Sequence, residues 1–386
     1  MKSRSFASVV FVLIAGGIFP IPLQAEDPNG DLVFIIAADM RNFAADGEWS
    51  KNFSGACEAV KEVGAGSFMI SPGDLDVRPP SAVRDMIDKT IGEGYPWYPV
   101  LGNHDPESPS SMEYLRNYSK TVPNVVNRGP KGCEETTFSF DYGDAHFIVL
   151  NQYFDGVRDW GLKGEIVPEL MAWLQADLEA NNKKHIFVFG HEPLLPMPDM
   201  DNGRLRHQGD SLDEDPENAF ALHQLLLKHG VRAYVCGHTH NTSYGKINGL
   251  WQLDPGHARG LEEASYADKM FAAIERAIEE GKKNGVGEAN SLRQLYRDDE
   301  YHIDYWFKYL GLKDQPVTQT LAQFYTEYKN DPTARERYYE AQIEGRKQTR
   351  SSFFRVIVGD ETVSVEIYRD DARGGPYELR KTFVLN

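Results

Sequence analysis

The sequence has few cysteines and no excess of positive charge. Only three of its 386 residues are cysteines, Cys57, Cys133 and Cys236, and they lack zinc-finger or redox spacing. A disulfide-rich scaffold is therefore excluded, while a single bridge between Cys57 and Cys133 stays open. Acidic residues outnumber basic residues by 58 to 41, giving a formal net charge of −17. We therefore expect no nucleic-acid partner and no broad surface for anionic membranes.

The sequence also lacks an apolar run long enough to cross a membrane, which takes about 20 residues. The apolar run at 9–19 follows Lys2 and Arg4 and precedes the small residue Ala25. This order is typical of a secretory signal peptide, with an uncleaved anchor as the alternative. We expect residues 1–25 to be removed and the protein to be secreted or periplasmic, with no stable membrane span.

Composition and periodicity predict a layered α/β protein. Hydrophobic residues make up 41% and charged residues 26% of the chain, which is too apolar for a disordered protein. From Asp31 onward, short apolar runs alternate with segments of helical period. The expected strands are 32–38, 67–71 and 97–101, and the expected helices between them are 49–63 and 83–91. This βαβαβ order predicts parallel strands.

Later segments predict a second sheet that begins with antiparallel pairing. The runs 136–140 and 145–150 flank the turn Tyr142-Gly143-Asp144, which is a hairpin signal. Further elements are expected as a helix at 170–178, a strand at 185–189, a helix at 220–227 and strands at 231–236 and 251–253. Charged, helix-favouring sequence predicts a helical insertion at 259–349. A terminal β-hairpin is expected from 353–358 and 363–368.

Five predicted strands end in residues that are able to bind a metal ion. These residues are Asp39; Asp74; Asn103, His104 and Asp105; His191; and His238 and His240. Ligands bind at the carboxyl ends of strands in α/β sheets, so these loops should meet at one edge. Taken singly, each residue also fits a turn, a surface or a core position. Together, carboxylates, an amide and imidazoles form a set that divalent metals accept.

These motifs resemble those of the calcineurin-like metallophosphoesterases, which include purple acid phosphatases and many phosphodiesterases. The resemblance covers roughly residues 32–258 and rests on Gly102-Asn103-His104-Asp105 and Gly237-His238-Thr239-His240, in that order. It implies a four-layer α/β/β/α sandwich with two mixed sheets. The expected domains are a signal peptide at 1–25, a core at 26–258, a helical insertion at 259–349, and a C-terminal β-hairpin at 350–386 that returns to the core.

The resemblance also implies a role for each site residue. It assigns one metal ion to Asp39, Asp74 and His240, and the other to Asn103, His191 and His238, with Asp74 bridging. The expected cofactors are two divalent or transition metal ions, Mn, Fe or Zn. Their charge would make a shared water acidic enough to attack the phosphoryl group as hydroxide. The resemblance implies that His104 protonates or stabilises the leaving oxygen, with Asp105 orienting its ring.

The sequence departs from the family pattern at the first metal site. Arg41 stands where the family usually has a histidine ligand, and a guanidinium has no lone pair to donate. Val77 occupies the neighbourhood of the metal-binding tyrosine of purple acid phosphatases, so a tyrosinate-bound iron is not expected. Arg41 has three open interpretations. It points away while Asp46, Asp254 or water completes the site; it contacts substrate phosphate; or its charge weakens or replaces the first metal ion.

The sequence therefore predicts an exported metal-dependent phosphoesterase that hydrolyses mono- or diesters of a small phosphorylated substrate. The alternative is a catalytically weak or inactive binding protein of the same fold, with a depleted first metal site and one bound ion. A nuclease is disfavoured because the acidic chain repels a polyanion. Arg41 and His257 are candidate substrate contacts. The polar loop at 198–216, with Arg206 and His207, either lines the cleft or is solvated.

Overall fold

The fold is known from a computed structural model of the chain. It describes residues 30–41, 48–75, 79–161, 163–197, 199–200, 206–207, 210–258, 262–263, 267–287, 291, 348–349, 351–370 and 376–386. The expected signal peptide and most of the expected insertion at 259–349 lie outside these residues. Within the described part of the chain, no helix combines the length and apolar character that a transmembrane span requires.

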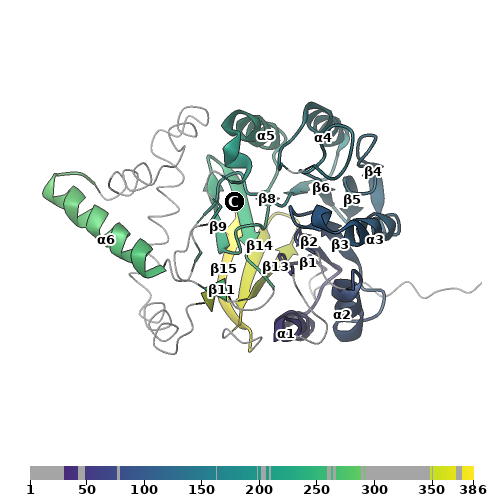
Figure 1. The fold of residues 1–386 in the computed structure, drawn as a ribbon, viewed down its shortest axis with the longest axis horizontal. Coiled ribbons are helices and arrows are strands. Elements are labelled where there is room, and N and C mark those ends of the chain that lie inside the picture. The colour runs from purple at the N-terminus through teal and green to yellow at the C-terminus, as the bar shows by residue number, and fades with distance from the viewer. Residues whose placement is uncertain are drawn as a thin grey trace, which may run out of the picture.

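The first of two large mixed sheets joins the two ends of the described chain (Figure 1). In spatial order its strands are β15 (Glu378–Leu385), β14 (Val363–Arg369), β13 (Ser352–Val358), β1 (Leu32–Ile36), β2 (Phe68–Pro72) and β3 (Trp97–Val100). Strands β1, β2 and β3 are parallel, as predicted. The predicted hairpin is confirmed as β13 and β14, and β13 pairs antiparallel with β1.

The second sheet contains the hairpin that was predicted in the middle of the chain. In spatial order its strands are β4 (Val125–Arg128), β5 (Phe138–Tyr142), β6 (Ala145–Val149), β7 (His185–Phe189), β8 (Ala233–Val235), β10 (Leu250–Pro255) and β9 (Thr242–Ile247). The hairpin β5–β6 is antiparallel, whereas β6, β7, β8 and β10 are parallel neighbours. The sequence did not predict β4 or β9.

Helices cover the outer face of each sheet, which is consistent with the expected sandwich (Figure 1). The first sheet packs against α1 (Glu48–Val63), α2 (Ala82–Thr90) and α3 (Pro109–Ser119), and the second against α4 (Pro168–Ala180) and α5 (Pro216–Lys228). Two 3₁₀ turns, η1 (Asp105–Glu107) and η2 (Leu212–Glu214), precede α3 and α5. Within 259–349 the structure describes helix α6 (Ala267–Lys283) and the paired strands β11 (Glu262–Glu263) and β12 (Gln348–Thr349).

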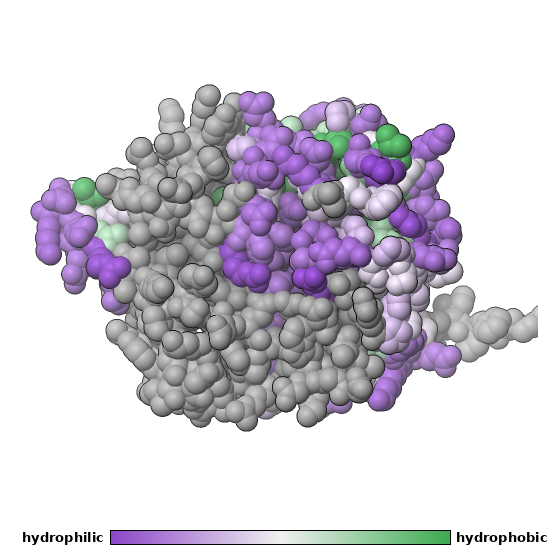
Figure 2. All heavy atoms as spheres, in the orientation of Figure 1, coloured by the Kyte–Doolittle hydropathy of each residue, from purple (hydrophilic) through white to green (hydrophobic). Residues whose placement is uncertain are grey.

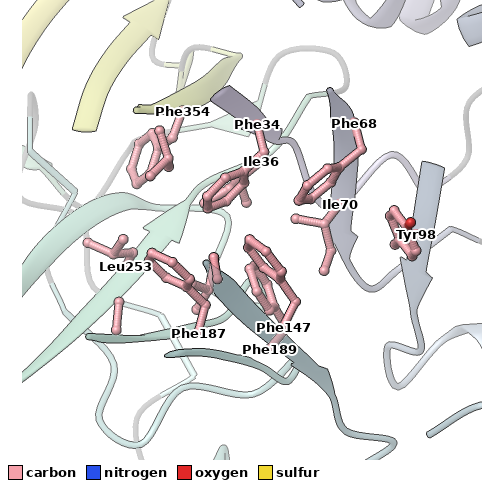
Figure 3. Packing of buried hydrophobic residues seen from close by; sticks show 14 of the residues in the cluster. Phe34, Ile36, Phe68, Ile70, Tyr98, Phe147, Phe187, Phe189, Leu253 and Phe354 are labelled. Atoms are coloured by element: carbon pink, nitrogen blue, oxygen red, sulfur yellow. The ribbon is translucent and has the colours of Figure 1, made fainter. Parts of the chain in front are cut away.

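An aromatic core holds the two sheets face to face (Figure 3). Phe34 and Phe68 of the first sheet are fully buried and stack with ring centroids 5.3 Å apart. From the second sheet, Phe147 and Phe187 approach Phe34 edge-on at 5.2 and 5.4 Å. Such ring pairs contribute roughly 0.5–1.5 kcal/mol each beyond the area that they bury. This core therefore fixes the position of one sheet's strand ends relative to the other's.

The cysteines do not form the bridge that the sequence left open. Cys57, Cys133 and Cys236 are all buried free thiols. Cys57 lies in the core between the first sheet and its helices, whereas Cys133 lies in the core of the second sheet. Separate cores do not supply the short distance that a disulfide needs, so the bridge that the sequence left open does not form. Burial raises the pKa of Cys133 to about 12, which leaves its thiol protonated and unreactive.

The described surface is mostly hydrophilic, with isolated hydrophobic spots on the face seen in Figure 2. Among the described residues, the exposed large hydrophobic side chains are Val126, Val157, Trp160, Leu379 and Val384. They come from several separate segments of the chain. Scattered apolar side chains of this kind do not define a binding surface.

Candidate metal centre

Side chains from both sheets meet where the strands end. The loops after β1, β2 and β3 carry the oxygen donors Asp39, Asp74 and Asn103. The loops after β7 and β8 carry the imidazoles His191, His238 and His240. The contacts described below connect all six residues. The prediction that these strand-end loops meet at one edge is confirmed.

The first group of donors comprises Asp39, Asp74 and His240. One ligand atom from each residue lies within 4.8 Å of the others, and all three residues are buried. Nε2 of His240 is 3.3 Å from Oδ1 of Asp39. Two carboxylates so close together in a buried place repel each other unless a positive charge lies between them. The chemistry of this set fits a divalent cation.

The second group comprises Asn103, His191 and His238. Oδ1 of Asn103 is 3.1 Å from Nε2 of His191 and 3.2 Å from Nδ1 of His238. Oδ1 of Asp74 is 3.5 Å from Nε2 of His191, so Asp74 belongs to both groups. An amide oxygen, two imidazoles and a shared carboxylate also fit a divalent cation.

Backbone carbonyls fix the protons of the two imidazoles in the second group. Nδ1 of His191 is 2.7 Å from the carbonyl oxygen of Pro72, and Nε2 of His238 is 2.9 Å from that of Asp210. A carbonyl only accepts, so these nitrogens carry the protons and the opposite nitrogens direct lone pairs at Asn103. Burial lowers the pKa of both histidines, that of His238 well below the usual value. Both rings are therefore neutral, as ligation requires.

A third cluster, His207, Asp210 and His238, also brings three possible ligands within 4.8 Å of one another. Nδ1 of His207 is 3.0 Å from Oδ2 of Asp210, and the His207 and His238 rings are 4.1 Å apart. His238 already uses Nε2 toward the Asp210 carbonyl. The cluster is therefore better described as a loop packed on His238 than as a metal site. The sequence left open whether the loop at 198–216 lines the cleft or is solvated. Its described residues His207 and Asp210 contact His238, which supports the first interpretation.

Four of the six residues have a left-handed backbone. The φ angles are 56° at Asp39, 56° at Asp74, 69° at His238 and 57° at His240. A residue with a side chain is held in this region at a cost of about 1–3 kcal/mol, and such strain concentrates at functional sites. The fold therefore holds the backbone of these four residues in an unfavourable conformation at the strand ends.

The glycines before the ligands allow neighbouring loops to approach. A Cβ atom on Gly73 would collide with the ring of His191, and one on Gly237 would collide with the carboxylate of Asp39. Gly73 also has a φ of +91°, which accords with the predicted sharp turn. Glycine is required at position 237 because the backbone there packs closely against Asp39 of the other sheet.

Arg41 points into the site and contacts His104. Nη1 of Arg41 is 2.9 Å from Nε2 of His104, and Nη2 donates to Oε2 of Glu107 at 3.0 Å. Oε1 of Glu107 is 2.7 Å from Nδ1 of His104, which closes a three-residue ring. About a quarter of each of the Arg41 and His104 side chains is exposed. The interpretation in which Arg41 points away is therefore wrong.

Asp105 has a different role from the predicted one. Its buried carboxylate accepts hydrogen bonds from the backbone N–H of Leu75 at 2.8 Å and of Gly102 at 2.7 Å. These bonds tie together the loops that carry Asp74 and Asn103. The carboxylate that contacts the His104 ring belongs to Glu107, three residues after the histidine in η1. This i, i+3 spacing was the signal that sequence analysis missed.

Two other candidates lie behind the ligands. His257 is fully buried, with its ring 5.9 Å from that of His240, so the predicted direct substrate contact is not supported. Asp254 accepts hydrogen bonds from Oγ1 of Thr239 at 2.5 Å and from the N–H of Gly256 at 2.8 Å. It therefore supports the loop that carries His238 and His240. Asp46 and Val77 lie outside the described residues.

The sequence also gave no indication of the support around His191. Oε1 of Gln152 accepts hydrogen bonds from the backbone N–H of His191 at 2.6 Å and of Glu192 at 2.7 Å. Tyr153 donates to Oε1 of Glu192 at 2.9 Å. Burial raises the pKa of Glu192 to about 8, so this carboxyl is mostly protonated at neutral pH. These contacts position the loop that carries His191.

Comparisons with known proteins agree with this geometry. A family model described as "Calcineurin-like phosphoesterase" matches residues 27–242, more than half of the chain. Tartrate-resistant acid phosphatase type 5 of Oryctolagus cuniculus is 24% identical over 252 residues, covering 60% of this chain and 72% of that protein. The Homo sapiens protein of the same name is 25% identical over 242 residues, covering 52% and 67%. A solved structure titled "Structure of PhoD" has a TM-score of 0.50 at 10% identity, covering 94% and 70%, which shows the fold alone.

Proposed function

Because the chain belongs to the calcineurin-like phosphoesterase family and is homologous to acid phosphatases, which are hydrolases, we propose that it hydrolyses phosphate mono- or diesters with bound metal ions. The observation that carries this proposal is the meeting of three oxygen donors and three imidazoles at the strand ends of two sheets. The proposed substrate is a small phosphorylated molecule.

The two groups of donors would hold the two metal ions. Asp39, Asp74 and His240 would bind one ion, and Asn103, His191 and His238 the other, with Asp74 shared. Ions of Mn, Fe or Zn bound there would neutralise phosphoryl oxygens and acidify a water molecule. The chain's contribution is to bring the carboxylates together and to orient the neutral imidazoles of His191 and His238 through backbone carbonyls.

Arg41 is proposed as the residue that contacts the substrate phosphate. It lies at the partly exposed rim, and its planar fork of donors matches two phosphate oxygens. Glu107 accepts from Nη2 and thereby holds the guanidinium toward the site. This placement supports the second interpretation of Arg41 and leaves the third, a weakened first metal site, open.

His104 is proposed to donate a proton to the leaving oxygen. Arg41 donates to Nε2, so the proton of a neutral His104 is on Nδ1, facing Glu107. Donation from Nε2 therefore requires Arg41 to turn from His104 to the phosphate. A bound phosphate provides that attraction, so substrate binding would free Nε2 to take up and deliver a proton.

The test is to purify the full chain, count its bound metals, and assay aryl phosphate mono- and diesters with Mn, Fe, Zn or no metal. We expect metal-dependent hydrolysis that a chelator abolishes, and a kcat about 10²- to 10⁴-fold lower in His104→Ala. His229→Ala, at the C-terminal cap of α5, is the matched control and should retain activity. Protein that stays inert after reconstitution would contradict the proposal.

One alternative function has a specific observation in its favour. Arg41 stands in place of a metal-binding histidine and brings positive charge to the site. A catalytically weak or inactive binding protein would follow if this charge excluded the first ion. In that case the assay would detect one bound ion and phosphate binding without turnover.

Export and domain organisation remain part of the proposal. We propose that residues 1–25 direct the chain to a secreted or periplasmic location, and that 26–258 and 350–386 form the catalytic core around an insertion at 259–349. Expression of the full chain, followed by N-terminal sequencing of protein outside the cytoplasm, tests the first point. A start at residue 26 is expected, and retention of residue 1 would contradict cleavage.

A further inference from the structure

A second arginine, Arg206, contacts a proposed metal ligand. Its Nη1 is 2.6 Å from Nδ1 of His240, and the side chain of Arg206 is half-buried. On the other side of the same ring, Nε2 of His240 is 3.3 Å from Oδ1 of Asp39. The imidazole of His240 is thus held between a guanidinium and a carboxylate.

This contact determines which nitrogen of His240 carries the proton. A guanidinium has only N–H donors, so Nδ1 of His240 must accept with its lone pair. The proton of the neutral ring then sits on Nε2, the atom that faces Asp39. A metal ion needs a lone pair at that atom, so the arrangement at His240 opposes ligation. His191 and His238 show the reverse, because carbonyl oxygens accept from one nitrogen and leave the other free to ligate.

Described residues on both sides of Arg206 are anchored. Asp199 pairs with Arg369 of β14 through two contacts of 3.0–3.1 Å, and both side chains are fully buried. Beyond Arg206, His207 stacks near His238, and Asp210 accepts from the same ring. The described residues before and after Arg206 are therefore held against the core.

We infer that Arg206 makes the Asp39–Asp74–His240 site the weaker of the two metal sites, so that an ion enters it only when Arg206 leaves His240. This inference rests on the proposed function, because it takes both donor groups to be metal sites. A dication at Asp39 would also repel the nearby guanidinium. The protein should therefore hold one ion tightly, at Asn103, His191 and His238, and a second ion weakly.

The test is calorimetric titration of the metal-stripped full chain with Mn²⁺ alone, which needs no activity measurement. We expect two binding phases whose dissociation constants differ by at least about 10-fold, the usual scale for a partner of a ligand. His240→Ala should remove the weak phase and His191→Ala the tight one. Arg206→Ala should strengthen the weak phase about 10-fold. Arg206→Glu should strengthen the weak phase at least as much. A carboxylate would accept a hydrogen bond from Nδ1 of His240 and leave the lone pair on Nε2.

Arg158→Ala is the matched control, because this arginine is exposed and pairs with Asp155. It should leave both phases unchanged. Two ions bound with equal affinity, an unchanged weak phase in folded Arg206→Ala, or loss of the tight phase in His240→Ala would overturn the inference and leave the proposed function intact. Absence of any Mn²⁺ binding would instead overturn the proposed function together with the inference.

Discussion

The two sheets supply different chemistry to the same site. The first sheet contributes oxygen donors, Asp39, Asp74 and Asn103, whereas the second contributes only imidazoles among the six proposed ligands. Neither sheet alone carries a mixed donor set. The complete set exists only when the sheets pack face to face through the aromatic core in Figure 3. Metal binding should therefore depend on sheet packing as strongly as on the ligands themselves.

The dependence of metal binding on sheet packing is tested most severely by weakening the core between the sheets. Phe34→Ala removes a fully buried ring that contacts Phe68, Phe147 and Phe187. We expect the free energy of unfolding, measured in urea, to fall by about 3–5 kcal/mol, with metal release following the same transition. Val126→Ala, at an exposed position, is the control and should change stability by less than about 0.5 kcal/mol. Metal release at a lower urea concentration than unfolding would show that metal binding does not depend on the packing of the sheets.

The next largest effect is expected at the residue shared by both donor groups. Asp74→Ala removes the carboxylate that lies beside His191 and within the first group. We expect kcat/KM to fall about 10²- to 10³-fold, because both ions lose a ligand. Asp144→Ala, at the exposed turn between β5 and β6, should be neutral. Full activity in Asp74→Ala would contradict a shared carboxylate.

A smaller effect is expected from Glu107, which belongs to the first sheet's side of the site but binds no metal in our proposal. Glu107→Ala removes the contacts with Arg41 and His104. We expect kcat to fall about 10-fold, because Arg41 and His104 are no longer held in position. The metal content should not change, because Glu107 is not a proposed ligand. Glu113→Ala, on the exposed side of α3, is the control. Loss of metal in Glu107→Ala would show that this residue supports the ions instead.

The smallest effect concerns the second sheet away from the site. Burial lowers the pKa of His146, but its contacts with Asp177 and Asp141 outweigh this and raise it above the usual value. A raised folded pKa stabilises the protein below the unfolded pKa of about 6.5. That stabilisation disappears as pH rises through the folded value.

His146→Gln should therefore cost about 1–2 kcal/mol of unfolding free energy near pH 5.5. The cost should be smaller above the raised pKa, where the wild-type ring is also neutral. Urea denaturation at several pH values measures the difference. A cost that grows with pH would show that the ring is neutral throughout.

The ligand positions could be predicted because they follow apolar strands directly. The run that ends at Ile36 leads to Asp39, and the run that ends at Phe189 leads to His191, so local order alone placed both at a sheet edge. Helix α3 was missed although Ser108 and Pro109 are ordinary start signals, and Ser108 does cap it. Strand β4 is only partly buried and gave no apolar run.

The contacts among site residues could not be predicted, because they depend on how loops meet in space. Glu107 and Asp105 lie in the same 3₁₀ turn, yet one faces His104 and the other binds backbone N–H groups. Arg206 is 34 residues from His240 along the chain and reaches it through a loop with no periodic pattern. The sequence named Asp105 and Arg206 as candidates but did not indicate these partners, and it did not single out Glu107.

The pairing of β13 with β1 has a consequence for synthesis of the protein. Strand β1 is made early, but its antiparallel neighbour is Ser352–Val358, and β14 and β15 extend the sheet beyond it. While the chain is still on the ribosome, one side of β1 therefore remains an open edge that could pair with another nascent chain. Aggregation during translation should therefore depend on how well the open edge of Leu32–Ile36 is covered before β13 is synthesised.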